Sequence, residues 1–430
     1  MAHYGLLCPS SPGHLNPSLV LAQTLMGRGH QVTVFTNEDW ETAVAATGVG
    51  VCCIGRDALP KGSSAENFRQ LGELSGMAAV QFTVKLLDNY NRISLEEMPE
   101  KVRELGVDGL IVDQVSRAGG TIADYLELPF VTVCNALPLD QEPMVPPPMR
   151  SWLYESGIGA KIRNRVGYGI LNQMTKEIRQ TIDGYRSQWG LPAVSVDESY
   201  SPLARLSQLP KSFDFPRQQL PPWFHYLGPF QRGDRQEPLG IDAPPFPFEK
   251  LDGRPLVYAS LGTLQNQLPH IFKAIAAACE PLDVQLVMSL GRTDSALQGI
   301  ELVGDPIVVT YAPQQQLIDR AAAMVTHAGM NGVLSALSVG VPLVAVPIAN
   351  EQPGIAARIA GSGAGLMLEL KGLDSDRLRE AVQTVLTDPS YRQRSQQLQR
   401  EIQDAGGVER AADIVEQAIA TKQPVLAAQA

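Results

Sequence analysis

One stretch in the C-terminal half, residues 311–352, constrains the fold of this chain more than any other. It contains two short apolar runs, Ala322–Thr326 and Val341–Ile348, with a glycine-rich turn and a helix-like segment ending at Gly340 between them. Apolar runs of this length, each bounded by turn residues, are typical of buried parallel strands. Polar residues follow both runs, and the first of them is His327. Ligands bind at the carboxyl ends of strands in open α/β sheets, so the pattern predicts a binding site here.

The turn after the first run predicts a phosphate site. Gly329 and Gly332 allow backbone N–H groups to approach an anion closely, and the start of the following helix adds about half a positive charge. The side chains of His327 and Asn331 can donate hydrogen bonds to the same anion. Met330 is the only bulky side chain between the two glycines.

The residues on either side of this turn predict sites for a base and a sugar. Tyr311 offers a flat face on which a base can stack. Glu351 and Gln352 bring hydrogen-bond acceptors and donors to one point, which suits a group with several hydroxyls. The stretch therefore predicts base, phosphate and sugar sites in that order.

These residues resemble the nucleotide-sugar signature of the family 1 glycosyltransferases, the UDP-glycosyltransferases. In that family a Trp-Ala-Pro-Gln segment opens the signature, a His-x-Gly-x-Asn turn holds the pyrophosphate, and an acidic residue followed by Gln holds the donor sugar. The matching donor-site residues are Tyr311, Ala312, Gln314, His327, Gly329, Met330, Asn331, Gly332, Glu351 and Gln352.

Two positions depart from the family signature. Tyr311 replaces the Trp and keeps a stacking face. Ser335 stands where the family usually has an acidic residue that holds the ribose hydroxyls, so a weaker hold on the ribose is expected. A further turn, Gly262-Thr263, follows the apolar run Val257–Leu261 and resembles a Gly-Ser/Thr turn that the family places near the donor phosphate.

The N-terminal segment predicts a second α/β unit and a catalytic base. Tyr4–Cys8 is expected to be a strand, and Asn16 to cap a helix whose first residue is Pro17. The turn between them is not G-x-G-x-x-G, which argues against a dinucleotide cofactor. It presents His14 within a segment that resembles the family's Gly-His-x-x-Pro turn, whose His is the catalytic base. A turn or capping histidine is the alternative.

A carboxylate partner for His14 is expected at the end of another strand. The run Val107–Asp113 predicts a buried strand that ends in an acid. A carboxylate behind an imidazole fixes its tautomer and stabilises the imidazolium, and the resemblance implies this role for Asp113. The alternative is that Asp113 caps the next helix, Ala118–Leu126. Asp108 opens the strand and is therefore expected at the opposite edge.

The 430-residue chain is long enough for two or three domains, and its 44% hydrophobic content suits sizeable cores. The resemblance implies a GT-B fold, in which two Rossmann-like α/β domains face each other across a cleft. Prolines and charges recurring between residues 220 and 253 indicate a linker. We predict an acceptor-binding domain at 1–230, a linker at 231–253 and a nucleotide-sugar-binding domain at 254–405. A final helix with a tail, at 406–430, is expected to pack on the first domain.

Charge, cysteines and hydropathy exclude several classes. The net charge of −10 argues against nucleic-acid binding, which needs a basic surface. The five cysteines lack C-x-x-C or zinc spacing and are expected to be reduced thiols in a cytoplasmic protein. Neither a signal peptide nor a membrane span is expected. Asp374-Ser375-Asp376 resembles a metal-binding Asp-x-Asp, but it directly precedes a helix and is interpreted as its N-cap, so no metal is expected.

Residues 149–175 have two interpretations. Trp152, Ile158, Ile162 and Val166 belong to a set of apolar residues at near-helical spacing, interleaved with basic residues. One hypothesis is that they form an apolar entrance to the acceptor site, which receives a lipophilic acceptor. In this hypothesis the protein binds peripherally to the inner face of a membrane. The other is a helix that packs into the core and keeps a solvated basic face.

The resemblance implies metal-independent, inverting transfer of a hexose, with glucose expected, from a UDP-sugar to a hydroxyl of a lipophilic small molecule. The UDP-sugar is a substrate, and no cofactor is expected. A narrower resemblance, in residues 133–139 and 352–359, is to bacterial zeaxanthin glucosyltransferases and implies a hydroxycarotenoid acceptor. The alternatives are a UDP-sugar epimerase on the same fold and a non-catalytic nucleotide-sugar-binding protein.

Overall fold

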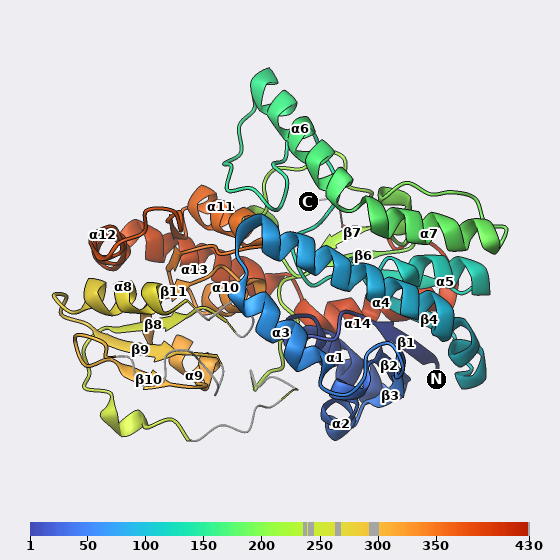
Figure 1. Cartoon of the computed structure of the whole chain (residues 1–430), viewed down its shortest axis with the longest axis horizontal. Coiled ribbons are helices and arrows are strands. Elements are labelled where there is room, and N and C mark those ends of the chain that lie inside the picture. Colours follow the sequence, from blue (N-terminus) through green and yellow to red (C-terminus); the bar gives the residue numbers. More distant parts are fainter. Residues whose placement is uncertain (235–238, 240–244, 263–267, 292–300, 429–430) are drawn as a thin grey trace.

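The computed structural model describes residues 1–234, 239, 245–262, 268–291 and 301–428. Figure 1 shows two α/β halves side by side, with the N-terminal half on the right and the C-terminal half on the left. Each half is built on its own parallel sheet with helices on both faces, which confirms the predicted fold class.

Over the described residues, the first sheet has seven strands in the order β3-β2-β1-β4-β5-β6-β7. The strands are β1 (His3–Leu7), β2 (Gln31–Thr36), β3 (Gly50–Cys53), β4 (Gly109–Asp113), β5 (Phe130–Cys134), β6 (Arg205–Ser207) and β7 (Phe224–Tyr226). The helices of this half are α1 (Pro12–Gly27), α2 (Glu38–Ala46), α3 (Ser63–Glu73), α4 (Gly76–Leu105), α5 (Ala118–Leu126), α6 (Ile158–Met174) and α7 (Lys176–Gln188), with short 3-10 turns η1 (Asp197–Ser199) and η2 (Lys211–Phe213).

The second sheet, over the same described ranges, has six strands in the order β10-β9-β8-β11-β12-β13. The strands are β8 (Leu256–Ser260), β9 (Gln285–Ser289), β10 (Ile307–Val309), β11 (Ala321–Thr326), β12 (Leu343–Ala345) and β13 (Gly365–Met367). The remaining elements are η3 (Phe248–Lys250), α8 (Pro269–Cys279), α9 (Gln314–Ile318), α10 (Met330–Leu337), α11 (Gln352–Ser362), α12 (Ser375–Thr387), α13 (Pro389–Asp404) and α14 (Gly407–Thr421).

Two prolines explain why strand β12 is shorter than the apolar run that contains it. The run Val341–Ile348 is buried throughout, yet β12 covers only Leu343–Ala345. Pro342 and Pro347 flank it, and proline has no N–H to donate to a neighbouring strand. The apolar run therefore predicts burial correctly and strand length incorrectly.

The first helix begins earlier than the sequence predicts. Ser11 is at the N-cap position of α1 and Pro12 is in its first turn, so Asn16 is not the cap and Pro17 lies inside the helix. A proline at the first helical position is favourable, which explains the earlier start. His14 consequently lies in the first turn of α1 rather than in a loop before it.

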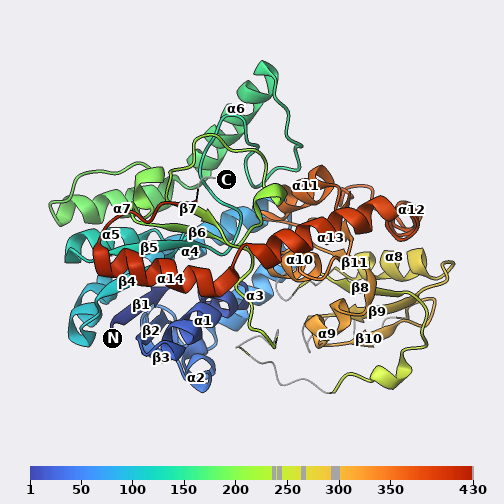
Figure 2. The same ribbon diagram turned by 180° about the vertical axis from the view of Figure 1, so that it is seen from behind.

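The last helix returns to the first half. Figure 2 shows α13 and α14 in line, with α14 lying across the N-terminal half, where it packs against α1 and β5. Parts of the predicted linker, 235–238 and 240–244, lie outside the described residues. The domain boundaries remain predictions.

Other expectations concern cysteines, the Asp-x-Asp segment and membrane spans. All five cysteines are free thiols. Asp374 is the N-cap of α12, where its carboxylate accepts a hydrogen bond from the Arg377 N–H. In the part of the chain that the structure describes, none of the helices has both the length and the apolar character needed to cross a bilayer.

Candidate active site

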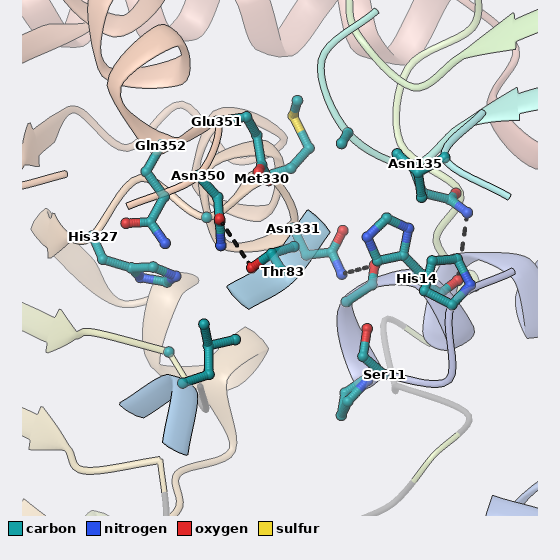
Figure 3. A pocket seen from close by; sticks show the side chains of 18 of the residues that line it. Ser11, His14, Thr83, Asn135, His327, Met330, Asn331, Asn350, Glu351 and Gln352 are labelled. Carbon is teal, nitrogen blue, oxygen red and sulfur yellow. Dashed lines mark hydrogen bonds between the residues drawn. The ribbon is translucent and has the colours of Figure 1, made fainter. Parts of the chain in front are cut away.

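A cavity of about 410 Å³ lies between the two halves. Strand ends and helix starts from both halves form its walls, and Figure 3 shows their side chains converging on it. The predicted residues on its walls are His14, Gly262, Tyr311, Ala312, Gln314, His327, Gly329, Met330, Asn331, Gly332, Glu351 and Gln352. Thr263, also predicted, lies outside the described residues.

His14 and Asp113 form a hydrogen-bonded pair on the first half of the cavity. His14 Nδ1 lies 2.7 Å from Asp113 Oδ2, and the Asp113 side chain is only 1% exposed. A carboxylate accepts hydrogen bonds, so Nδ1 carries the proton and donates, which leaves Nε2 as an acceptor. The Asp113 capping alternative does not hold for α5, whose N-cap is Arg117.

The surroundings raise the pKa of His14 above its ordinary value. Burial alone would lower this pKa, but the Asp113 carboxylate, through charge and hydrogen bond, outweighs it, and the charge of Glu351 acts in the same direction. His14 is therefore a stronger base than an isolated imidazole, while its side chain keeps 23% exposure toward the cavity. This combination suits a group that takes a proton from a bound molecule.

The sequence analysis missed Asn135, which holds this pair in place. Its Nδ2 donates to Asp113 Oδ2 at 2.7 Å and to Ser18 Oγ at 3.0 Å. Its own Oδ1 accepts from Gln208 Nε2 at 2.6 Å, which fixes the amide orientation. Asn135 follows β5 directly. It could have been predicted from the tendency of ligand-binding residues to lie at the carboxyl ends of parallel strands.

The second half provides a glycine-lined pocket for His327. A Cβ added at Gly262 would lie 2.6 Å from the His327 ring, and one at Gly329 would lie 2.5 Å from it. Only glycine allows this approach, which explains both positions. Burial lowers the pKa of His327 to about 4, so the ring is neutral near pH 7 and offers an N–H rather than a charge.

Backbone strain marks the segments that follow β11 and β12. Ala328 has φ +65° and Asn350 has φ +55°, which is the left-handed region that non-glycine residues seldom adopt. Such residues cost about 1–3 kcal/mol each and gather at functional sites. Here they turn the chain so that α10 and α11 begin at the cavity.

Gln352 is held by the strand end that precedes it. Its side-chain oxygen accepts hydrogen bonds from the N–H groups of Ile348 at 2.8 Å and Ala349 at 3.0 Å. The orientation of this amide is therefore set by the protein before a ligand binds. Such preorganisation lowers the entropy cost of holding a sugar hydroxyl.

The two halves touch directly at the cavity through Asn331. Its Nδ2 donates to the Gly13 carbonyl oxygen at 3.1 Å (Figure 3). Within α1 this carbonyl would ordinarily accept from the N–H four residues later, which belongs to Pro17 and does not exist. The proline inside the helix thus leaves an acceptor beside His14 that the second half satisfies. Thr83 Oγ1 makes a similar contact with Asn350 Oδ1 at 3.2 Å.

Ser335 is not on the cavity wall. It is 2% exposed, and its Oγ accepts hydrogen bonds from Gln315 Nε2 at 2.9 Å and Gln231 Nε2 at 3.1 Å. Gln231 comes from the segment between the halves, so this hydroxyl connects that segment to α10. The structure therefore places Ser335 behind the donor side rather than beside the other predicted residues.

The remaining wall of the cavity, on the first half, is largely apolar. Side chains of α3, α4, α6 and α7 contribute to it, together with the loop after β5. These apolar residues are Phe68, Leu71, Val80, Val84, Leu87, Leu139, Met149, Leu171 and Ile178. The arrangement can hold a lipophilic molecule near His14 while polar groups of the second half hold a charged one.

Two facing parallel α/β halves, with a His–Asp pair on one side of the cavity and a glycine-lined strand end on the other, define a protein of GT-B fold. The sequence model of the UDP-glucoronosyl and UDP-glucosyl transferase family matches residues 74–406, and the chain belongs to that family. The predicted family is thereby confirmed.

The chain is also similar to individual members of this family and to solved structures. The chain is 33% identical to a zeaxanthin glucosyltransferase of Pantoea ananas, over 99% of this chain and 98% of that protein. It is 30% identical to a zeaxanthin glucosyltransferase of Pseudescherichia vulneris, over 99% and 100% of the two chains. The crystal structure of the glycosyltransferase of kitacinnamycin superposes with a TM-score of 0.73 at 24% identity, over 97% of this chain and 98% of that one, and supports the fold.

Proposed function

We propose that this chain transfers glucose from UDP-glucose to a hydroxyl of a lipophilic small molecule, with inversion at the anomeric carbon and without a metal ion. A hydroxycarotenoid such as zeaxanthin is the first candidate acceptor. The observation that carries the proposal is the His14–Asp113 pair, which faces the glycine-lined strand end across one cavity. The names of the two relatives support glucose and the carotenoid.

In the proposed reaction His14 Nε2 accepts the proton of the acceptor hydroxyl. The hydroxyl oxygen forms a bond to the anomeric carbon, and the bond from that carbon to the phosphate oxygen breaks, with its electron pair leaving on UDP. Attack from the face opposite the leaving group inverts the configuration. Asp113 keeps the His14 tautomer and stabilises the imidazolium that forms.

The second half is proposed to stabilise the charge that develops on the leaving phosphate. The first turn of α10 lines the cavity, where the free N–H groups of a helix start can bind a phosphate, and neutral His327 adds another donor. Tyr311 lies on the same wall and is proposed to stack on the base. Metal independence is supported by Asp374, whose carboxylate caps a helix instead of facing the cavity.

The apolar wall beside His14 supports a lipophilic acceptor. Since a carotenoid partitions into lipid, we place the protein in the cytoplasm and in peripheral contact with the inner face of a membrane. A non-catalytic nucleotide-sugar-binding protein is the second candidate, because Ser335 replaces the family's usual acid. The family assignment lends no support to the epimerase alternative.

The test measures UDP release from UDP-glucose with and without a chelator, and with and without zeaxanthin. We expect acceptor-dependent release that His14→Ala lowers by about 10²–10⁴-fold, the usual contribution of a general base. UDP binding by His14→Ala and activity of the surface variant His270→Ala should be unchanged. The anomeric configuration of the product, read by NMR, tests inversion.

Each outcome selects one function. Release with other lipophilic alcohols or phenols, but not with zeaxanthin, would keep the reaction and discard the carotenoid. Tight UDP binding without release for any acceptor would establish the binding protein instead. Release that stops with chelator would show that a metal takes part.

A further inference from the structure

An apolar stripe lies exposed along α6. Its residues are Ile158, Ile162, Val166 and Ile170, which are 78%, 57%, 59% and 42% exposed. Residues four apart lie on one helix face, offset by about 40° per step, so the four side chains form a continuous strip. Large exposed apolar residues concentrated in this way mark an interaction surface. The core-packing alternative for these residues is therefore wrong.

The opposite face of α6 is anchored to the protein. Ala160, Asn164, Gly167 and Tyr168 are buried. Asn164 Nδ2 donates to the Pro143 carbonyl oxygen at 3.0 Å. The helix therefore has one face that is already packed and a second, apolar face that points away from the body, and Figure 1 shows it projecting from the molecule.

The charges on this helix are all positive. α6 carries Lys161, Arg163 and Arg165 and no acidic residue, in a chain whose net charge is −10. Lys161 and Arg165 are exposed and border the stripe. The acid nearest to the helix in the sequence, Glu155, is paired with Arg163 at 3.0 Å. An apolar strip bordered by cations on an otherwise acidic protein is complementary to an anionic lipid surface.

An aromatic side chain packs against the middle of the helix. The Trp152 ring packs under the guanidinium of Arg163, with 4.8 Å from the guanidinium carbon to the ring centroid, and under that of Arg150, at 5.6 Å. Tryptophan and arginine are favoured at the level of lipid headgroups, where an apolar body and a polar edge are both satisfied.

We propose that this surface, consisting of the stripe and of Lys161 and Arg165, docks on an anionic lipid bilayer. The isoleucine and valine side chains enter the boundary between headgroups and acyl chains, and the cations bind the lipid phosphates. A second copy of the chain suits the surface less well, because a two-fold contact through the stripe would bring two basic helices together.

The position of α6 connects this surface to the cavity. Leu171, Asn172 and Thr175, at the end of the helix, line the cavity wall. The stripe ends at Ile170, so a lipophilic molecule leaving the bilayer along α6 meets the apolar side of the cavity next. This route rests on the proposed function, whereas the docking itself does not.

Docking is tested by sedimentation of the full chain with phosphatidylcholine vesicles, with and without phosphatidylglycerol. We expect binding to the anionic vesicles that weakens at high salt. Ile158→Ser/Ile162→Ser and Lys161→Glu/Arg165→Glu should each weaken it by at least about 10-fold, since each removes one of the two attractions. None of these residues lines the cavity.

Matched control variants distinguish binding through this surface from nonspecific effects of exposed apolar residues and of net charge. Leu105→Ser/Leu426→Ser removes two exposed leucines elsewhere, which are 39% and 62% exposed, and Lys273→Glu/Lys371→Glu makes the same change of net charge on the second half. Both should bind vesicles like the wild type. Equal binding by the α6 variants and their controls overturns the proposal.

Two further readouts keep the outcomes distinct. UDP release with a water-soluble phenol should be the same for the α6 variants and the wild type, which shows that they are folded. Absence of UDP release by the wild type with any acceptor, while the α6 variants still lose vesicle binding, would contradict the proposed function and leave the docking surface intact. A wild-type dimer that Ile158→Ser/Ile162→Ser dissociates, without vesicle binding, would instead assign the stripe to a second copy.

Discussion

At the scale of single residues, the environment of His14 sets its basicity. Asp113 receives hydrogen bonds from His14 Nδ1, from Asn135 Nδ2 and, through Oδ1, from the Val115 N–H at 3.0 Å. A buried carboxylate needs such donors to replace water. With both oxygens engaged, Asp113 cannot turn away from the imidazole, so the proton stays on Nδ1 and Nε2 faces the cavity as a base.

This arrangement predicts a change of pH dependence in Asp113→Asn. Because a carboxylate raises the pKa of His14, its removal should lower that pKa. The neutral base would then persist to lower pH, so the acid limb of kcat/KM should move to lower pH. The plateau should fall by about 10²–10⁴-fold as the imidazolium loses its partner.

The measurement is the pH profile of UDP release, together with an NMR titration of the His14 ring. Asp108→Asn, at the opposite end of the same strand, is the control and should leave both unchanged. A His14 titration that stays at the wild-type pH in Asp113→Asn would contradict the electrostatic role of the carboxylate.

At the scale of elements, α11 carries the predicted sugar-binding end of the site against the first half. Gly354, in its first turn, donates its N–H to the Pro148 carbonyl oxygen at 2.9 Å. A Cβ at this position would lie 2.2 Å from the same oxygen and 3.0 Å from a Leu137 methyl group. The close approach of helix and loop therefore requires glycine.

Gly354→Ala should displace the start of α11, since the clash is with backbone and no flexible side chain can yield. We expect a loss of about 1–3 kcal/mol in stability, as for other overpacked sites, and a loss of about 10- to 100-fold in kcat/KM because Gln352 shifts with the helix. Gly184→Ala in α7, where nothing lies within 4 Å of the added Cβ, should gain about 0.5–1 kcal/mol. Thermal unfolding and UDP-glucose titrations measure both, and normal kinetics in Gly354→Ala would refute the placement of α11.

Sequence patterns predicted elements with continuous apolar or capping signals well. The expected span of α5 agrees with the structure, and the strand ends that carry Asp113 and His327 were found because polar residues lie at the ends of buried runs. The start of α1 was wrong because two prolines, Pro12 and Pro17, both fit the first helical turn and local rules cannot choose between them.

Other features depend on contacts between distant segments and have no local signal. The contact of Asn331 with Gly13 requires knowledge of which halves face each other. The exposure of the α6 stripe could not be predicted from the sequence either, because an apolar repeat at helical spacing is compatible with a buried helix face or with a lipid-facing one. The engagement of Ser335 by Gln231 and Gln315 depends on side chains from three separate segments.

At the scale of the whole molecule, a buried ion cluster joins the two halves. Arg358 of α11 donates from Nε to Asp214 Oδ1 at 2.8 Å, and Arg217 donates from Nε to Asp214 Oδ2 at 2.7 Å. All three side chains are at most 2% exposed. Burial alone would raise the pKa of Asp214, but the two guanidinium groups lower it to about 2, so the cluster stays charged at neutral pH.

Arg358→Met should therefore loosen the two halves. Among the described residues it removes the one partner of Asp214 that comes from the second half. Because Arg217 also lies 4.0 Å from the buried Glu142 carboxylate, two buried carboxylates are then left with a single guanidinium, at a cost of about 3–5 kcal/mol. Arg205→Met is the matched control, because it breaks a buried pair with Asp140 within the first half. Both variants should unfold at lower temperature. Only Arg358→Met should increase the radius of gyration in small-angle X-ray scattering and raise the KM for UDP-glucose. Only in this variant does α11 lose its ion pair with Asp214, which belongs to the half that carries His14. An unchanged radius of gyration in Arg358→Met, with the same loss of stability, would mean that the cluster stabilises the fold without setting the distance between the halves.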